Sequence, residues 1–399
     1  MKILVIQEAD WTDVGIHDSH QIFERLNESG HQIRVIDHEF RWRKNLDRKG
    51  LISPRREKTV ARVVSGAEIS VITPGFVRIS FLDYFTTLIS HRFEISRQIK
   101  IFSPDIIIGL GIFNSSFASK KAKKKGIPFV YYILDELHKL VPNRQLSPIA
   151  RIVESGTMRR ADQLIVTSVA LRDYASSMGA EMTSIEFVPH GYAGHEPSIE
   201  RRRKIRTELG LNERDIVLFF MGWLYDFSGL LELVEEILAT EREDLKLLIV
   251  GKGDIENKLM DLANGPARGK LLLQGWKPFE EIFDFLNAAD ICVMPFQNID
   301  LMKNSVPIKI IEYLASGKPV ISTPLNGIIK EFGTDGGILY AEKSSEFIER
   351  VLYIDNNDLY DKYGEKAVKS VENREWGQIT SRFASILERI VMKEKEDSK

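Results

Sequence analysis

Cysteine is almost absent from this sequence, whose 399 residues include only one, Cys292. A single cysteine excludes a disulfide framework and argues against a cysteine-based metal site, so the reducing cytoplasm is the expected location. Long apolar runs are lacking too. The opening residues, MKILVIQEAD, contain too short an apolar run for a signal peptide. No stretch approaches the roughly 18 uninterrupted apolar residues of a membrane-spanning helix.

Charge of one sign does not dominate the chain, whose net charge is −2, but it is unevenly distributed. Residues 1–195 carry 27 Lys and Arg against 21 Asp and Glu, whereas residues 196–399 carry 28 against 36. The basic half suits an anionic acceptor or a peripheral contact with an anionic membrane, and a solvated surface is the alternative. Two runs, 55–58 and 120–125, carry part of the excess, although the second also fits a helix end before Gly126. We expect no nucleic-acid partner.

Short apolar runs alternate with longer amphipathic segments along the whole chain. The runs are almost continuously apolar, which is typical of parallel strands covered by helices on both faces. The alternation occurs twice, and 399 residues are too many for one compact core, so we predict two doubly wound, Rossmann-like α/β domains. The predicted strands are 2–7, 32–37, 105–110, 128–134, 164–168, 216–222, 246–251, 270–275, 291–296, 319–323 and 336–340.

The domain boundary is predicted within residues 187–200, FVPHGYAGHEPSIE, which are rich in proline, glycine and histidine. We therefore expect a first domain of residues 1–190 and a second of residues 191–375. An amphipathic helix at 376–391 is expected to pack back on the first domain. In such sheets ligands bind beyond the carboxyl ends of the strands, and two domains with facing strand ends would enclose a cleft.

The most informative segment is NSVPIKIIEYLASGKPVIST, residues 304–323. Asn304 or Ser305 can cap a helix that starts around 305–307, and Pro307 suits its first turn. Gly317 is placed to end this helix. The spacing of Ser305, Lys309, Glu312 and Ser316 predicts one polar stripe along it.

Lys309 is oddly placed in that predicted helix. A cation in the first turn opposes the helix dipole by about 0.3–1 kcal/mol, whereas the free N–H groups there favour an anion. A bound phosphate would make Lys309 favourable, and Glu312, one turn further on, can accept hydrogen bonds from sugar or ribose hydroxyls. The alternative is a solvated Lys–Glu pair on an ordinary surface helix, and the residues alone leave both interpretations open.

The order and spacing of several motifs over most of the chain resemble the GT-B glycosyltransferases, specifically the retaining family GT4. One motif is the loop with Gly15 after the first strand, and another is VPHGYA at 188–193. The element LLIVGKGDIENKL, followed by QGW and FDFLNAADICVMPF, resembles two βα units of the family's second domain. PIKIIEYLASGKPVIST resembles its most diagnostic segment.

The resemblance implies roles for individual residues. Glu312 matches the second glutamate of the family's E-x7-E motif, which holds the ribose hydroxyls of the nucleotide. Lys309 and the backbone around Ser305 and Val306 would meet the diphosphate, and Asp135 would lie on the acceptor side. The implied catalytic set is Asp135, His138, Lys309 and Glu312. The implied donor-binding set is Gly15, Gly222, Trp223, Gly251, Lys252, Trp276, Asn304, Ser305, Val306, Pro307, Lys309 and Glu312.

Two departures from the family pattern bear on the donor. Asn304 stands where the first glutamate of E-x7-E is expected, which alters the usual contact with the sugar. Trp223 and Ser228 stand where the family often supplies an Arg and a Lys to clamp the diphosphate. Lys309 and Lys252 are candidate substitutes for that clamp.

Together these features predict a hexosyltransferase-type enzyme that moves a sugar, with retention, from a UDP- or GDP-sugar to a hydroxyl acceptor. The expected acceptor is a glycan, lipid-linked or otherwise a precursor of a cell-surface glycan. No DxD motif occupies a suitable position, so we expect neither a metal nor another cofactor. The alternatives are a degenerate nucleotide-binding partner subunit, or an epimerase or phosphorylase of the same fold. A NAD-dependent dehydrogenase is disfavoured because no GxGxxG follows the first strand.

The remaining histidines and tryptophans point less clearly to function. His20 and His31 are predicted to be structural, and His190 is predicted to be a turn residue rather than a ligand. Trp11, Trp223 and Trp276 lie in predicted loops at strand ends. Each can stack on a base or sugar or pack in a core.

Overall fold

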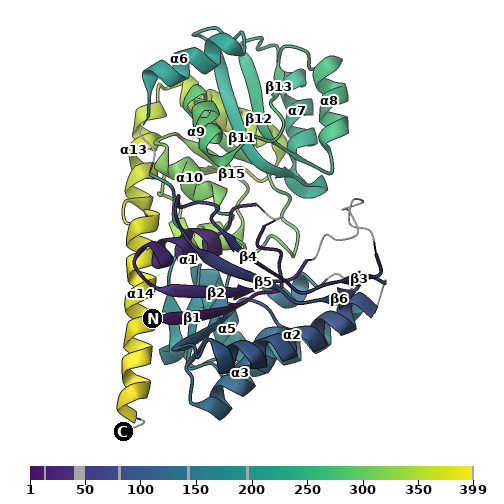
Figure 1. The fold of residues 1–399 in the computed structure, drawn as a ribbon. Helices are drawn as coiled ribbons and strands as arrows, with labels where there is room; N and C mark the ends of the chain where they lie inside the picture. Colours follow the sequence, from purple (N-terminus) through teal and green to yellow (C-terminus); the bar gives the residue numbers. More distant parts are fainter. Residues whose placement is uncertain (13–14, 40–49, 80–81, 142–143, 195–196, 398–399) are drawn as a thin grey trace. The chain divides into compact units, whose positions relative to one another are not determined.

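The computed structural model of the chain describes residues 1–12, 15–39, 50–79, 82–141, 144–194 and 197–397. The chain forms two compact units (Figure 1). Unit 1 consists of Met1–His190 together with Trp376–Lys399, and unit 2 consists of Gly191–Glu375. Each unit is built around one mainly parallel sheet, which confirms the predicted doubly wound α/β class.

In unit 1 the described residues form an 8-stranded sheet in the order β10-β9-β8-β7-β1-β2-β5-β4. Neighbouring strands run parallel except for β4 and β5. Because β1 pairs with β7 on one side and β2 on the other, the strand order reverses at β1, where doubly wound folds bind ligands. The strands are β1 (Lys2–Ile6), β2 (Gln32–Ile36), β4 (Arg56–Val60), β5 (Ile69–Thr73), β7 (Ile106–Gly109), β8 (Phe129–Ile133), β9 (Gln163–Val166) and β10 (Ile185–Phe187), and β3 (Ile52–Ser53) pairs separately with β6 (Phe76–Val77).

One face of this sheet is covered by consecutive helices. Ile95, Ala118, Met158 and Leu171, one from each of four helices, share an apolar core with strand residues such as Tyr131. These helices are α2 (Leu82–Ile101), α3 (Phe113–Lys125), α4 (Ser147–Met158) and α5 (Val169–Ser177), and the short 3-10 helices are η2 (Leu137–Lys139), η3 (Arg144–Leu146) and η4 (Met182–Ser184).

The other face is covered by α1 (Asp18–Glu28) and α14 (Trp376–Asp397), which lie side by side (Figure 1). Successive strand residues point to opposite faces, so Tyr132 points away from the core that holds Tyr131. The ring of Phe383 on α14 packs edge-on against Phe23 of α1 and Tyr132 of β8, with centroid separations of 6.1 and 5.3 Å. The last helix of the chain thus completes the core of the first unit.

In unit 2 the described residues form a 6-stranded, parallel sheet in the order β13-β12-β11-β14-β15-β16. The strands are β11 (Ile216–Leu224), β12 (Leu245–Gly253), β13 (Leu271–Leu273), β14 (Ile291–Met294), β15 (Val320–Ser322) and β16 (Ile338–Tyr340). The helices are α6 (Ile199–Glu208), η5 (Asp226–Ser228), α7 (Leu230–Ala239), α8 (Glu256–Asn264), α9 (Phe279–Ala288), α10 (Lys309–Ala315), α11 (Asn326–Phe332), α12 (Ser344–Asn356) and α13 (Tyr360–Val371).

The predicted apolar runs all form strands, and the strands that were not predicted lie mostly towards the edges of unit 1. One of these strands is β4, which is exposed, antiparallel and at the edge of the sheet, and the basic run at 55–58 lies at its start. Arg55 pairs there with Glu94 at 3.0 Å and with Glu57 at 2.8 Å, and Arg56 pairs with Glu39. The run at 120–125 forms the end of α3, and Gly126 ends this helix with a φ of 61°.

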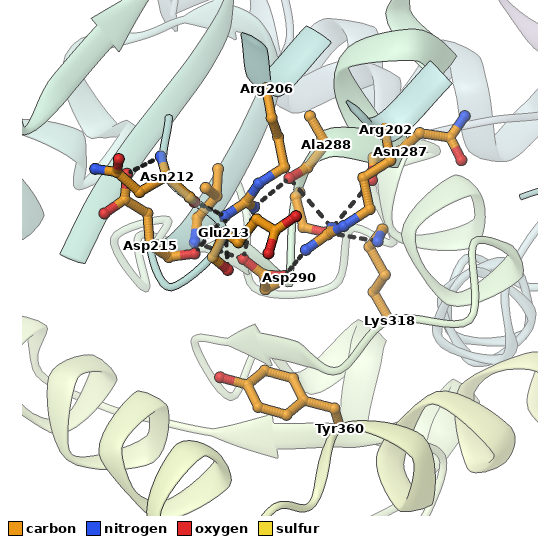
Figure 2. A network of polar contacts seen from close by, with 12 residues as sticks. Arg202, Arg206, Asn212, Glu213, Asp215, Asn287, Ala288, Asp290, Lys318 and Tyr360 are labelled. Carbon is orange, nitrogen blue, oxygen red and sulfur yellow. Dashed lines mark hydrogen bonds and ion pairs between the residues drawn. The ribbon is translucent and has the colours of Figure 1, made fainter. Parts of the chain in front are cut away.

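A polar network holds the amino-terminal ends of strands β11 and β14 in unit 2 (Figure 2). Arg206 of α6 is buried, and its guanidinium donates to the carbonyl oxygens of Ala288, Asn212 and Asp215 at 3.0, 2.6 and 2.7 Å. These carbonyls belong to the end of α9 and to the turn before β11. A buried arginine therefore supplies donors that the backbone lacks at this point.

Arg202 and Lys318 extend the same network (Figure 2). Both donate to the carbonyl oxygen of Ala289, at 2.8 and 2.6 Å, next to the carboxyl end of α9, where a helix dipole favours cations. Arg202 also pairs with Asp290 at 2.5 Å, and Asp290 accepts the backbone N–H of Val217 at 2.8 Å. The network lies at the opposite end of β11 from Gly222 and has a structural role.

We expect Arg206→Ala to lower the free energy of unfolding by about 3 kcal/mol, because buried carbonyls lose a charged donor. Arg203→Ala, at an exposed position on the same helix, should stay within about 0.5 kcal/mol of the parent. Urea denaturation of the full chain measures both. If Arg206→Ala lowered the free energy of unfolding no more than Arg203→Ala does, the network would not stabilise unit 2.

Candidate functional site

Two glycines bring β11 and β12 close together at their carboxyl ends. The strands stay paired as far as Leu224 and Gly253, and Gly222 lies opposite Gly251. A Cβ at Gly251 would lie 1.9 Å from the carbonyl oxygen of Gly222, so only glycine fits there. Gly222 itself has a φ of 121°, which strongly favours glycine. Both glycines were predicted as donor-binding positions, and the close approach of the two strands and the φ of Gly222 explain why glycine occurs there.

Helix α10 begins at Lys309, so the prediction that it starts around 305–307 with a cap from Asn304 or Ser305 is wrong. Residues 305–307 form an irregular segment before it. The side-chain amide of Asn326 donates to Asn304 Oδ1 at 2.7 Å. A Cβ at Gly327 would lie 2.5 Å from the carbonyl oxygens of both Asn304 and Ser305. This close packing against α11 fixes the segment in an irregular conformation.

Lys309 lies at the end of β11 with its ammonium against aromatic rings. Its Nζ is 4.1 Å from the ring centroid of Phe220 and 5.0 Å from that of Phe296. A Cβ added at Gly222 would lie 2.7 Å from the same nitrogen. Although the residue as a whole is partly accessible, burial of the ammonium lowers the pKa of Lys309 to about 7. Among the described residues, no carboxylate forms an ion pair with it.

Glu312, one turn after Lys309, is only 3% exposed. Its Oε1 accepts the backbone N–H of Ala193 at 3.1 Å, whereas its buried Oε2 has no hydrogen-bond partner within the described part of the chain. Burial raises the pKa of Glu312 to about 8. The alternative of a solvated Lys–Glu pair on a surface helix is therefore wrong, since Glu312 is buried and the ammonium of Lys309 lies against two aromatic rings.

Contacts within unit 2 hold α10 and the segment around Ala193 in place. The backbone N–H of Met221 donates to the hydroxyl of buried Tyr313 at 2.8 Å, which fixes α10 to β11. Tyr192 forms a parallel bridge with Glu375, and its N–H donates to the carbonyl of Arg374 at 2.9 Å. The VPHGYA element thus delivers a backbone donor to Glu312, a contact that the sequence did not reveal.

Three predicted donor-binding residues lie near the carboxyl ends of the strands of unit 2. Trp223 and Lys252 pair with each other in the last residues of β11 and β12, so the prediction that Trp223 lies in a loop is wrong, whereas Trp276 follows β13. Trp276 is 63% exposed, and the ammonium of Lys252 lies 5.4 Å from its ring centroid. The indole N–H of Trp223 donates to Asp254 at 3.4 Å. Trp276 is therefore placed to stack on a planar ligand. Trp11, which could also have stacked on a ligand, instead packs in the core of unit 1.

Ser228 closes the turn that follows β11. It is fully buried, and its Oγ has no hydrogen-bond partner among the described residues. The next residue is fixed as glycine, because a Cβ at Gly229 would lie 1.8 Å from the carbonyl oxygen of Pro295. A small hydroxyl side chain thus occupies the position where the resemblance led us to expect a phosphate-binding lysine.

A second polar cluster lies in unit 1, beyond β8 and at the start of α1. His190 Nδ1 is 2.5 Å from Asp18 Oδ2, and the hydroxyl of Tyr132 donates to the same oxygen at 3.4 Å. Burial raises the pKa of Asp135 to about 6, with the charge of His190 opposing the shift and that of Asp18 adding to it. Asp135, a predicted catalytic residue, therefore joins Asp18 and His190, which are 172 residues apart and were not predicted as site residues.

The other predicted residues of unit 1 have different surroundings. The Nδ1 of buried His138 is 2.9 Å from the hydroxyl of Tyr174 and 3.2 Å from Glu154, contacts that are typical of a structural histidine. Gly15 is exposed with open space around it, so its backbone alone does not require glycine. His20 has the structural role predicted for it, because its ring accepts the N–H of His17 at 3.0 Å and donates to Trp11 at 2.9 Å.

Two protein-family models match the chain. Residues 17–191 match the model described as glycosyl transferase 4-like domain, and residues 215–357 match glycosyl transferases group 1. An uncharacterized glycosyltransferase, MJ1069 of Methanocaldococcus jannaschii, is 24% identical over 331 residues, which are 80% of this chain and 81% of that protein.

Solved structures of low sequence identity share the fold over nearly the whole chain. Sucrose-phosphate synthase from Thermosynechococcus elongatus has a TM-score of 0.76 and 16% identity, covering 98% of this chain and 100% of its own. HepE from Anabaena, in complex with UDP-glucose, has a TM-score of 0.71 and 14% identity, with the same coverage.

The raised pKa of Glu312 predicts a pH-dependent stability difference between the parent and Glu312→Gln. Folding takes up a proton at Glu312 between the ordinary carboxyl pKa of 4.5 and about 8, so this carboxyl makes the folded parent less stable as pH rises through that window. We expect the advantage of the glutamine variant to grow by about 3 kcal/mol between about pH 5 and about pH 8. Urea denaturation at both pH values measures it.

Glu349→Gln, at an exposed position on α12, is the matched control and should show no such trend. A difference between parent and Glu312→Gln that stays constant with pH would mean that the carboxyl is ionised in the folded protein.

Proposed function

Because the chain belongs to the group 1 glycosyltransferases of the GT4 type and has their GT-B fold, we propose that it transfers a sugar from a UDP- or GDP-sugar to a hydroxyl acceptor with retention of configuration. The observation that carries this proposal is the burial of Glu312 with one oxygen unpartnered among the described residues. An unpaired buried acceptor costs about 1–3 kcal/mol, and a ribose hydroxyl that donates to Oε2 would remove that cost.

Lys309 supplies the charge that a diphosphate requires. An ammonium withdrawn from water, with no paired carboxylate in the described part of the chain, favours an anion at the end of β11. A bound diphosphate would raise the pKa of Lys309 again and keep it charged during the reaction. Lys309 can thus replace the Arg and Lys clamp whose positions Trp223 and Ser228 occupy.

The leaving diphosphate develops negative charge as the bond to the sugar breaks, and a fixed ammonium stabilises such charge efficiently in a dry site. In the proposed mechanism a donor phosphate oxygen takes the proton of the acceptor hydroxyl on the same face of the sugar, so no enzymic base is needed. Asp135 orients the acceptor hydroxyl. The contacts of His138 with Glu154 and Tyr174 favour a role in fixing η2 rather than the predicted catalytic role.

We propose that neither a metal ion nor another cofactor takes part, because Lys309 provides the positive charge at the diphosphate. Within the described residues, no group of three or more His, Cys, Asp and Glu side chains is arranged to hold a metal. The proposed acceptor is a glycan hydroxyl, free or lipid-linked. A cytoplasmic enzyme that touches an anionic membrane through unit 1 would meet a lipid-linked acceptor there.

Substitutions of Lys309 and Glu312 should separate phosphate from ribose recognition. We expect Lys309→Met to weaken UDP binding by about 10- to 100-fold while uridine binding changes little, because only the diphosphate meets the ammonium. Glu312→Gln should weaken both ligands. Isothermal titration with UDP and uridine, or with GDP and guanosine if those bind better, measures the affinities.

Lys343→Met and Glu349→Gln, both at exposed positions of unit 2, are the matched controls and should bind as the parent does. Parental affinity in Lys309→Met or in Glu312→Gln would contradict the roles assigned to these residues.

Retention can be tested without knowing the acceptor. Thermal unfolding with a panel of UDP- and GDP-sugars identifies the donor that stabilises the protein most, because a ligand of the folded state raises its stability. We expect slow hydrolysis of that donor, and NMR should show that the first sugar released has the donor's anomeric configuration. Release of the opposite anomer would refute retention, and a panel without any stabilising donor would refute the donor class.

A further inference from the structure

Helix α2 in unit 1 turns its polar side inward. Three polar residues of that side hold it to the rest of the unit through side-chain hydrogen bonds. His91 lies 2.9 Å from the carbonyl of Asp37, Gln98 accepts from Arg34 at 2.8 Å, and Glu94 accepts from Arg55 at 3.0 Å. All three are buried. These bonds fix the rotation of α2 about its axis. The residues on its outward side are therefore held facing outward.

The outward side of α2 is apolar. Leu82, Phe85, Ile89 and Phe93 follow one another at spacings of three and four residues, so they form one stripe over about three turns. Phe85 is 64% exposed and Phe93 is 73% exposed, while the other two are half exposed. Helices of soluble proteins normally have the reverse arrangement, and a contiguous exposed apolar stripe marks a surface that contacts something else.

The neighbouring helices continue this surface with basic residues. Helices α2, α3 and α4, which pack side by side, hold nine Lys and Arg and only three acidic residues, of which Glu94 and Glu154 are buried. Arg92 of α2 and Lys121 of α3 both lie over the ring of Phe117, at 5.6 and 5.7 Å. The cations are Arg92, Arg97, Lys100, Lys120, Lys121, Lys123, Lys124, Lys125 and Arg151.

We propose that the outward faces of α2, α3 and α4 dock on an anionic lipid bilayer. An apolar stripe flanked by lysines and arginines is the arrangement that inserts side chains at the headgroup boundary while cations meet lipid phosphates. Helix α4 adds two further exposed apolar residues, Ile149 and Ile152. Among the helices that the structure describes, none combines the length and the hydropathy of a membrane span.

Charge argues against a second copy of the chain as the occupant. A symmetric dimer places the same surface on both partners, so it would bring nine cations against nine. An anionic bilayer presents the opposite charge over the whole surface. The inference goes beyond the proposed reaction and does not depend on it, because none of the surface residues belongs to the nucleotide site in unit 2.

Vesicle sedimentation tests the proposal with the full chain. The parent should bind phosphatidylcholine vesicles that contain phosphatidylglycerol and bind pure phosphatidylcholine far less, and added salt should weaken the binding. Phe85→Ser with Phe93→Ser should lower the affinity by at least about tenfold, since two apolar side chains no longer insert. Lys120→Glu with Lys124→Glu should lower it at least as much.

The matched control, Lys258→Glu with Lys369→Glu at exposed positions of unit 2, should bind vesicles nearly as the parent does. Circular dichroism and thermal unfolding check that every variant is folded. Parental vesicle binding in the Phe85/Phe93 variant would overturn the proposal, as would an absence of binding by the parent. A parent dimer that this variant converts to a monomer without vesicles would assign the surface to a second copy instead.

Discussion

Two ionisable side chains of the short helix α10 are withdrawn from water without an ion-pair partner among the described residues. Removing an ammonium or a carboxylate from water costs several kcal/mol unless another charge or hydrogen bonds compensate. Here two rings flank the ammonium of Lys309 and one N–H reaches Glu312, so the compensation is incomplete. The lowered pKa of Lys309 and the raised pKa of Glu312 reflect this incomplete compensation. A ligand with an anionic group near Lys309 and hydroxyls near Glu312 would complete it.

Much of unit 2 keeps these two groups in position. Gly222 leaves room for the ammonium of Lys309, Tyr313 ties α10 to β11, and Gly327 packs against the segment before α10. The network around Arg206 holds the opposite end of β11. These contacts hold Lys309 and Glu312 in position, as is usual where a site is organised before its ligand binds.

The sequence predicted the fold well because parallel strands covered on both faces leave almost continuous apolar runs. It missed β4, whose exposed, charged residues lack that signature, and it placed the start of α10 too early, because the packing of Gly327 on residues 304–305 involves a distant segment. Glu312 was a candidate from the polar stripe, and the resemblance assigned it to the ribose. The links of Asp18 to His190 and of Glu312 to Ala193 join residues over 100 positions apart, which no local pattern reveals. Family membership favours a glycosyltransferase over an epimerase or a dehydrogenase.

The central claim is that Lys309 and Glu312 together bind the diphosphate and the ribose of a nucleotide sugar. A crystal structure of the full chain with UDP, or with GDP if it stabilises the protein more, tests this claim most directly. The account predicts a ribose hydroxyl within hydrogen-bond distance of Glu312 Oε2 and a phosphate oxygen within the same distance of Lys309 Nζ. A nucleotide bound elsewhere, or one that contacts neither side chain, would contradict it.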